Sequence, residues 1–262
     1  MTNNTSYRLK QTCFTLITLF VIILVMHSCV KDAGMPHTPT SDNSQLLIKT
    51  EFDLNIKEPS GLSLSWDANE LMVVSDHSNT VFRINKSGKT IQELAFSATD
   101  LEGVTYQKAN ETIWLVDEQK NKLYQLNKQG DKIAEHLLEY QDHPSNKGLE
   151  GITINTTNNH LFMLNEASPG LLLEFFNGQI INSTSLSFAP DYSGIFYEET
   201  EDKLWIISDE AKSIYKCDLK GNLLHTYDHT IDKAEGIVVI ENNIWLVSDS
   251  QNKLYKLEIE KK

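Results

Sequence analysis

One short phrase occurs five times in this chain: an acidic or hydroxyl residue, then glycine, then an apolar strand. The five copies are PSGLSL (59–64), DLEGVTY (100–106), GLEGITIN (148–155), YSGIFY (192–197) and AEGIVV (234–239). Their glycines are 42, 48, 43 and 42 residues apart. A strand-rich repeat of about 40–50 residues is typical of a β-propeller, in which each repeat forms one blade.

Each repeat contains the same series of strand-like segments. Second strands are expected at 70–76, 112–118, 160–166, 203–210 and 243–250, and third strands at 80–85, 122–127, 171–176, 213–218 and 253–258. These segments are rich in Val, Ile, Leu, Trp and Tyr, as strands prefer. Glycine-containing turns follow the third strands, and a fourth strand follows in most repeats, for example at 90–96 and 132–138.

The two ends of the chain are expected to form the last blade together. The fifth repeat reaches Lys262 without a fourth strand, whereas QLLIKTEFDLNI (45–56) is a strand without a repeat. Placing this N-terminal strand in the last blade joins both ends and removes an open sheet edge. We therefore predict an all-β propeller of five blades. Six blades remain the alternative because the 48-residue step is longer, and a β-sandwich would not explain the repeat.

Composition limits the partners of this chain. Its 262 residues carry a formal net charge of −13, and 40% of them are hydrophobic, which suits one large all-β domain. No basic run offers the phosphate contacts that a nucleic acid needs, so we expect no nucleic-acid partner. Cys217 is the one cysteine in the body of the chain, so the fold cannot depend on an internal disulfide.

The first thirty residues have a different character. Arg8 and Lys10 precede an apolar stretch of about 14 residues, which is short for a membrane span of about 20 and is typical of a secretory signal. The sequence VMHSC then resembles a bacterial lipobox with Cys29 as the lipidated residue. We predict a lipoprotein signal peptide at 1–28, a flexible tether at 29–44 and a single propeller domain at 45–262. An uncleaved membrane anchor is the alternative.

The repeated phrase predicts a ring of polar side chains at one mouth of the central channel. The first strand of each blade lines that channel, and the second runs antiparallel beside it. The residues before the glycines are Ser60, Glu102, Glu150, Ser193 and Glu235. The polar residues expected near the ends of the second strands are Asp76, Asp117, Asn165, Asp209 and Asp249. The glycines let neighbouring backbones approach the crowded axis.

Crowded carboxylates repel one another unless a cation offsets them, and hard oxygen ligands favour Ca²⁺. The sequence therefore predicts a Ca²⁺ site formed by Glu102, Glu150 and Glu235 with Ser60 and Ser193. The alternative is that each glutamate accepts backbone N–H groups from the next blade and joins the blades. The Asp and Asn residues at the second-strand ends could likewise anchor the following loops.

Other chemical motifs are missing from the sequence. It has no catalytic triad signature, no metal-binding histidine pattern, no CxxC pair and no phosphate loop. Trp114, Trp205 and Trp245 occupy the same second-strand position, which favours packing between blades over a ligand-stacking role.

The phrases DLEGVTY, GLEGITIN, YSGIFYEETEDKLWIISDEAKSIYKCDLKGN and AEGIVV resemble the SdiA-regulated (YjiK-like) family of bacterial envelope β-propellers. The likeness covers residues 45–262. It implies a propeller anchored in the cell envelope, and we expect the outer membrane or the cell surface rather than the inner membrane. The family supplies no catalytic residues that could be carried over.

Two functions compete at this point. The first is a lipid-anchored module that binds an unidentified ligand or protein partner, with Ca²⁺ in the acidic mouth. The alternative is a Ca²⁺-dependent hydrolase of lactonase-like or phytase-like type, in which the metal activates water. A phosphatase needs Lys or Arg beside the metal, and the ring offers mainly Asp, Glu, Ser and Asn. We therefore favour binding, with a lactonase as the better enzymatic alternative and a purely structural surface protein as a third.

Overall fold

The computed structural model describes residues 45–67, 69–140 and 147–260, all within one compact unit, Pro39–Lys262. The described residues form five four-stranded antiparallel sheets and no helix, so none of their elements is a helix long and apolar enough to cross a membrane. The predicted signal peptide (1–28), the tether (29–44) and Cys29 lie outside the described residues.

Each sheet is one blade, and four blades use strands that are consecutive in the chain. Blade 1 contains β2 (Pro59–Leu64), β3 (Glu70–Ser75), β4 (Thr80–Asn85) and β5 (Thr90–Ser97). Blade 2 contains β6 (Leu101–Gln107), β7 (Thr112–Asp117), β8 (Lys122–Leu126) and β9 (Lys132–Leu137). Blade 3 contains β10 (Leu149–Ile154), β11 (Leu161–Asn165), β12 (Leu171–Phe176) and β13 (Gln179–Ser185). Blade 4 contains β14 (Gly194–Glu198), β15 (Lys203–Ser208), β16 (Ser213–Cys217) and β17 (Leu223–Asp228). Blade 5 contains β18 (Ala234–Ile240), β19 (Asn243–Ser248), β20 (Lys253–Glu260) and β1 (Gln45–Asp53).

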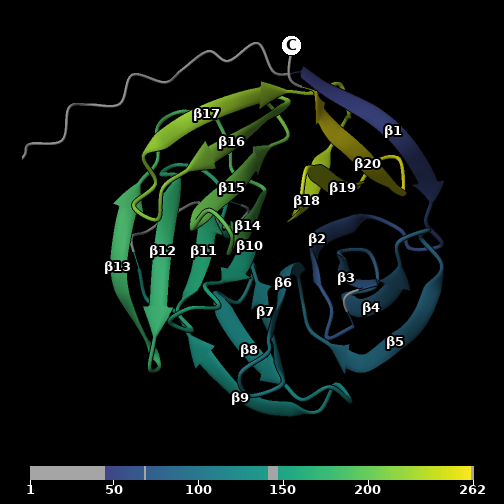
Figure 1. Ribbon diagram of the computed structural model, residues 1–262. Coiled ribbons are helices and arrows are strands. Elements are labelled where there is room, and N and C mark those ends of the chain that lie inside the picture. Colours follow the sequence, from purple (N-terminus) through teal and green to yellow (C-terminus); the bar gives the residue numbers. More distant parts are fainter. Residues whose placement is uncertain (1–44, 68, 141–146, 261–262) are drawn as a thin grey trace, which may run out of the picture. The chain divides into compact units, whose positions relative to one another are not determined.

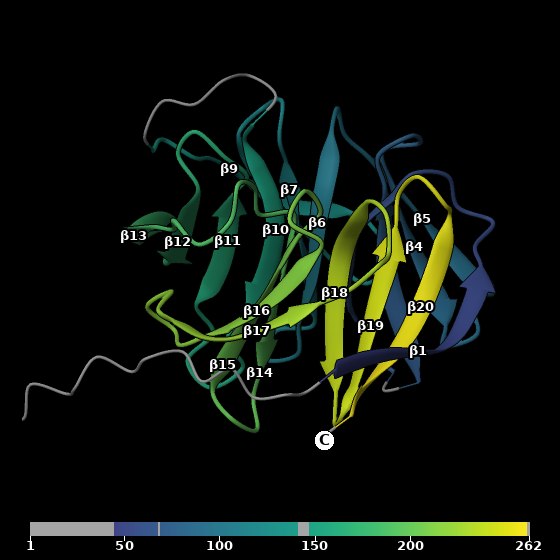
Figure 2. The same cartoon turned by 90° about the horizontal axis from the view of Figure 1, so that it is seen from above.

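The five blades form a closed ring around their inner strands (Figure 1, and Figure 2 for the view turned by 90°). The inner strands β2, β6, β10, β14 and β18 each contact the inner strands of the neighbouring blades, and β18 contacts β2. The prediction of five blades is confirmed, and the alternative of six is wrong. The longer 48-residue step corresponds to the connection between β9 and β10.

Strand β1 closes the ring as predicted. It pairs antiparallel with β20, from Gln45 opposite Glu260 to Asp53 opposite Lys253. On this outer strand, Phe52 stacks on Trp245 at a centroid distance of 6.4 Å. The N-terminal and C-terminal ends of the described chain therefore share one sheet.

Glycine is required in the repeated phrase because the inner strands lie very close together. A Cβ atom on Gly194 would lie 2.2 Å from the backbone oxygen of Glu235 in the next blade. A Cβ on Gly61 would lie 2.5 Å from the backbone oxygen of Glu102. No side chain tolerates these distances, so glycine sets the spacing of the blades around the axis.

The repeated tryptophans pack in the core, as predicted. Trp114, Trp205 and Trp245 are all buried. Trp114 belongs to an apolar cluster with Leu149 and Phe175 of blade 3, and Trp205 to one with residues of blade 5. Burying such large aromatic surfaces between neighbouring sheets stabilises the contacts between blades.

Candidate functional site

One end of the central channel is a polar pocket of about 180 Å³, which we call the acidic mouth. Eight carboxylates and a single lysine line it. Its lining residues are Ser60, Asp76, Glu102, Glu150, Glu166, Asp191, Ser193, Asp209, Lys233, Glu235 and Asp249. All five residues that precede the glycines are therefore brought together, as the sequence predicted.

Strand geometry explains why these side chains share one pocket. In β2, β6, β10 and β18 a register shift falls at the residue before the glycine, and a β-bulge of this kind redirects a side chain, here toward the mouth. The residues after the glycines are apolar and at most 3% exposed: Leu62, Val104, Ile152, Ile195 and Ile237. These residues belong to the apolar cores between the blades, so buried apolar side chains lie next to the acidic mouth.

Two of the predicted second-strand residues do not line the mouth. Asp117 and Asn165 are the last residues of β7 and β11 and are 0% exposed. Asp117 accepts hydrogen bonds from the backbone N–H groups of Thr99 and Lys120 at 3.1 and 2.9 Å. Asp117 therefore anchors the loop before β6 and the turn after β7.

Asn165 shows the same anchoring role in blade 3. Its side-chain amide donates to the backbone oxygens of Ala167 and Pro169 at 3.2 and 2.7 Å, and its oxygen accepts a hydrogen bond from Tyr140 at 3.0 Å. Asp76, Asp209 and Asp249 lie one residue beyond this position and do line the mouth. Their counterparts in blades 2 and 3 are Glu118 and Glu166.

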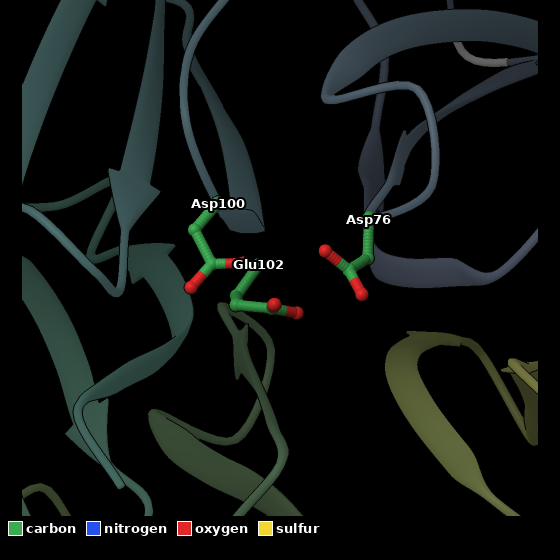
Figure 3. Close-up of side chains that lie close together, drawn as sticks. All are labelled: Asp76, Asp100 and Glu102. Atoms are coloured by element: carbon green, nitrogen blue, oxygen red, sulfur yellow. The ribbon is translucent and has the colours of Figure 1, made fainter. Parts of the chain in front are cut away.

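The first carboxylate cluster joins blades 1 and 2. Carboxylate oxygens of Asp76, Asp100 and Glu102 all lie within 4.8 Å of one another. Figure 3 shows Asp100 and Glu102 side by side and facing Asp76 across the gap between the blades. Ser60 donates a hydrogen bond of 2.6 Å to Glu102 Oε2. Three carboxylate oxygens are thus gathered at this point.

The second carboxylate cluster joins blades 2 and 3. Carboxylate oxygens of Glu118, Glu150 and Glu166 also lie within 4.8 Å of one another. The backbone N–H of Gly148 donates to Glu118 at 2.7 Å, and Lys147 Nζ lies 3.4 Å from Glu166. Glu118 therefore joins two blades, which is the role considered for the ring glutamates.

Glu235 lies apart from both clusters. Among the described residues, it belongs to no group of three carboxylates within 4.8 Å, so the three ring glutamates do not share a single site. Its surroundings contain the one lysine of the mouth, Lys233, which forms an ion pair with Asp209. The structure thus divides the predicted ring into two acidic clusters and one separate glutamate.

Only one ring glutamate is hydrogen-bonded across a blade boundary among the described residues. Glu102 of blade 2 accepts a hydrogen bond from the Ser60 hydroxyl of blade 1 rather than from a backbone N–H, and no described residue donates one to the Glu150 or Glu235 side chain. Ser193 does join blades, because its hydroxyl donates to the backbone oxygen of Ala234 at 3.2 Å.

The acidic mouth strongly disfavours ionisation of the ring glutamates. Burial raises the pKa of Glu102 and of Glu150 well above the usual range, and neighbouring carboxylates raise both further. For Glu102, the hydrogen bond from Ser60 partly offsets this effect. Burial, followed by the charge of Asp209, raises the pKa of Glu235 to about 8.

The second layer of carboxyl groups is perturbed in the same direction. Burial, with the charge of Asp100, raises the pKa of Glu118 to about 7 and that of Asp76 to about 6. Burial also raises the pKa of Asp191 to about 6. Near neutral pH, the mouth therefore holds protons that a bound cation would displace.

Fold and site together define a five-bladed β-propeller with an acidic pocket at one end of its channel. The model of the SdiA-regulated family matches residues 42–258, so the chain belongs to this family. No curated protein matches the chain.

Several solved structures share this architecture. A nidogen/laminin complex matches with a TM-score of 0.56 at 12% identity over 78% of this chain and 76% of that chain. A protein of unknown function from Bacteroides caccae matches with a TM-score of 0.52 at 12% identity over 72% and 70%. A virginiamycin B lyase from Staphylococcus aureus matches with a TM-score of 0.51 at 15% identity over 83% and 100%. At these identities the likeness establishes the fold alone.

Proposed function

We propose that this chain is an envelope-anchored binding protein that holds Ca²⁺ in the acidic mouth and uses it to bind an oxygen-rich ligand or a protein partner. The observation that carries this proposal is the gathering of eight carboxylates around one pocket with a single lysine. Buried carboxylates without cationic partners are costly, and a divalent cation offsets that cost. Oxygen donors alone suit Ca²⁺ better than Zn²⁺ or Cu²⁺.

A second feature of the mouth supports a cation site. Asp249 Oδ1 is buried from water and has no hydrogen-bond partner among the described residues. Desolvation raises the pKa of this carboxyl, and the charge of Glu58 adds to the effect. A bound cation would give such an oxygen a partner and favour its ionised form.

A Ca²⁺-dependent hydrolase of lactonase-like type is the second candidate. It is favoured by Glu118, whose pKa of about 7 suits a general base beside a metal-bound water. A phytase-like reaction is less consistent with the mouth because its one lysine, Lys233, is already paired with Asp209. Hydrolysis of simple lactones by the wild-type protein but not by Glu118→Gln would favour the enzyme over the binding protein.

Calorimetric titration of Ca²⁺ into metal-free protein tests the proposed function. We expect saturable binding to the wild type and at least tenfold weaker binding, about 1.4 kcal/mol, for Asp100→Asn and for Glu166→Gln, because each removes one anionic ligand from a cluster. The matched control is Glu93→Gln on the exposed outer strand β5, which should bind as the wild type does. A wild type that releases no binding heat with Ca²⁺ contradicts the proposal.

The proposed envelope anchor has its own test. Labelling of expressing bacterial cells with a palmitate analogue should mark the wild type and leave Cys29→Ala unlabelled, because the cysteine thiol is the predicted point of lipid attachment. The Cys217→Ala variant is the control, since Cys217 is buried inside blade 4 and should not affect labelling. Equal labelling of the wild type and Cys29→Ala would rule out a lipid at this residue.

A further inference from the structure

A second pocket, which we call the amide groove, lies between blades 2 and 3 at the strand ends opposite the acidic mouth. It has a volume of about 220 Å³. Four carboxamide side chains and four aromatic rings account for eight of its ten lining residues, and the other two are Leu161 and Gly178. The lining contains no Asp, Glu, Lys or Arg, although these residues make up 23% of the chain.

A hydrogen-bonded series fixes the orientation of the amides. Trp114 Nε1 donates to Gln107 Oε1 at 2.9 Å, and Gln107 Nε2 donates to Asn159 Oδ1 at 3.3 Å across the blade boundary. Thr112 donates to Asn110 Oδ1 at 2.6 Å. The acceptor oxygens are thus engaged, and the amide N–H groups of Asn110 and Asn159 have no hydrogen-bond acceptor among the described residues. Preorganised donors of this kind suit hydroxyl groups of a ligand.

Aromatic rings supply the other part of the groove. His136 stacks against Trp114 with a centroid distance of 6.0 Å and an interplanar angle of 25°, and it meets Phe175 edge-on at 5.3 Å. His136 remains partly exposed and can offer its ring to a ligand, whereas the Phe176 ring packs against His160 at a centroid distance of 4.4 Å. The electron-rich face of an aromatic ring attracts the weakly positive C–H groups of a sugar ring.

Blade 4 contains the charged counterpart of this arrangement. There Trp205 Nε1 donates to Glu198 Oε2 at 2.7 Å, and Tyr227 stacks on Trp205 at 5.5 Å. Lys216 lies 4.8 Å from the Trp205 ring centroid. The equivalent positions in blade 2 hold Gln107 and Gln125 in place of Glu198 and Lys216. The site in blade 4 therefore carries charged side chains around its tryptophan, whereas blade 2, at the amide groove, carries neutral amides at the same positions.

We propose that the amide groove binds a neutral saccharide, with its ring stacked on the His136 ring and its hydroxyls accepting hydrogen bonds from Asn110 and Asn159. Nucleotides and acidic sugars carry anionic groups, and the lining has no Lys or Arg to pair with them. The cavity volume suits a ligand about the size of one sugar ring. This site is separate from the acidic mouth and does not depend on Ca²⁺.

Binding of the full-length protein to an array of neutral and acidic glycans tests this proposal. The protein should be kept in a zwitterionic detergent, because glycoside detergents would compete. We expect binding confined to neutral glycans and unchanged by a calcium chelator. Asn159→Asp should weaken that binding at least tenfold, because it replaces the donating amide with a carboxylate while tolerating the positive φ of 62° at this position. His136→Ala should weaken it to a similar degree by removing the stacking surface.

Tyr227→Ala is the matched control, since it removes the ring stacked on Trp205 in blade 4 and should leave glycan binding intact. Melting curves of all variants identify any loss of binding that is caused by unfolding. The absence of neutral-glycan binding by the wild type would overturn the proposal. Equal loss of binding in Asn159→Asp and in the folded Tyr227→Ala control would also overturn it.

Discussion

A fragment that starts at residue 57 should melt at least 10 °C below one that starts at residue 45. The segment 45–56 supplies the whole of β1 and also Leu54 and Ile56, which are 7% and 2% exposed. Loss of a buried aliphatic side chain costs about 2–5 kcal/mol, so these two residues together contribute about 4–10 kcal/mol, to which the pairing of β1 with β20 adds. About 1 kcal/mol corresponds to roughly 2–4 °C for a domain of this size.

A peptide of residues 45–56 added to the shorter fragment provides the internal control. It should restore part of the lost melting temperature, because β20 would again pair its exposed edge. A peptide with Leu54 and Ile56 replaced by alanine should restore less. Equal melting temperatures for the two fragments would show that β1 does not contribute to the stability of the ring.

The architecture was predictable because the repeat is carried by local signals. Each strand has its own apolar pattern, and the glycine spacing gives the length of a blade. Even the closure by β1 followed from the missing fourth strand of the last repeat. The close approach of the inner strands at Gly61 and Gly194 explains why that glycine is constant in every repeat. A signal repeated five times is stronger than any single strand prediction.

The site was predictable only in part because the sequence indicates the register of a strand less clearly than it indicates the repeat. Choosing Asp and Asn by residue type placed Asp117 and Asn165 in the mouth. At the next position, Glu166 lines the mouth and Glu118 lies within 4.8 Å of Glu150 and Glu166. A shift of one residue turns a side chain to the other face of a strand. Aligning the five second strands by position rather than by residue type would have found both glutamates.

The grouping of carboxylates into two clusters could not be read from the sequence. It depends on Asp100, which lies two residues before Glu102, and on distances between blades that are set by packing. The amide groove was missed for a similar reason. Its residues come from turns and strand ends of two blades, and no single segment contains a recognisable motif.

The metal-free protein should lose stability as the pH rises from about 5 to about 8.5. Burial raises the folded-state pKa of Glu235 to about 8, whereas the unfolded chain ionises near its ordinary value of 4.5. The folded state therefore holds protons that the unfolded state has released, and stability that is full below pH 4.5 is lost as the pH passes through about 8. Glu102 and Glu150 shift in the same direction, so the combined loss should be on the order of a few kcal/mol.

The triple variant Glu102→Gln, Glu150→Gln, Glu235→Gln tests the origin of this loss. In chelator it should show a shallower dependence of melting temperature on pH and should be more stable than the wild type at pH 8.5, because amides do not repel. The slope should not vanish, since the pKa of Asp76 and that of Asp191 are also raised, to about 6. The control Glu93→Gln, on the exposed face of β5, should keep the wild-type slope.

Calcium should then affect the melting of the wild type and of the triple variant differently at pH 8.5. Because calcium binds the folded state preferentially, it should stabilise the wild type by about 2.7 kcal/mol at a hundredfold excess over Kd. Its melting temperature should rise accordingly. The triple variant should respond much less because each carboxylate cluster has lost one anionic ligand and Glu235 is also neutral. A triple variant that is less stable than the wild type in chelator at pH 8.5 would show that the ring glutamates stabilise the propeller as hydrogen-bond acceptors. The acidic mouth would then be a structural element of the ring rather than a cation site.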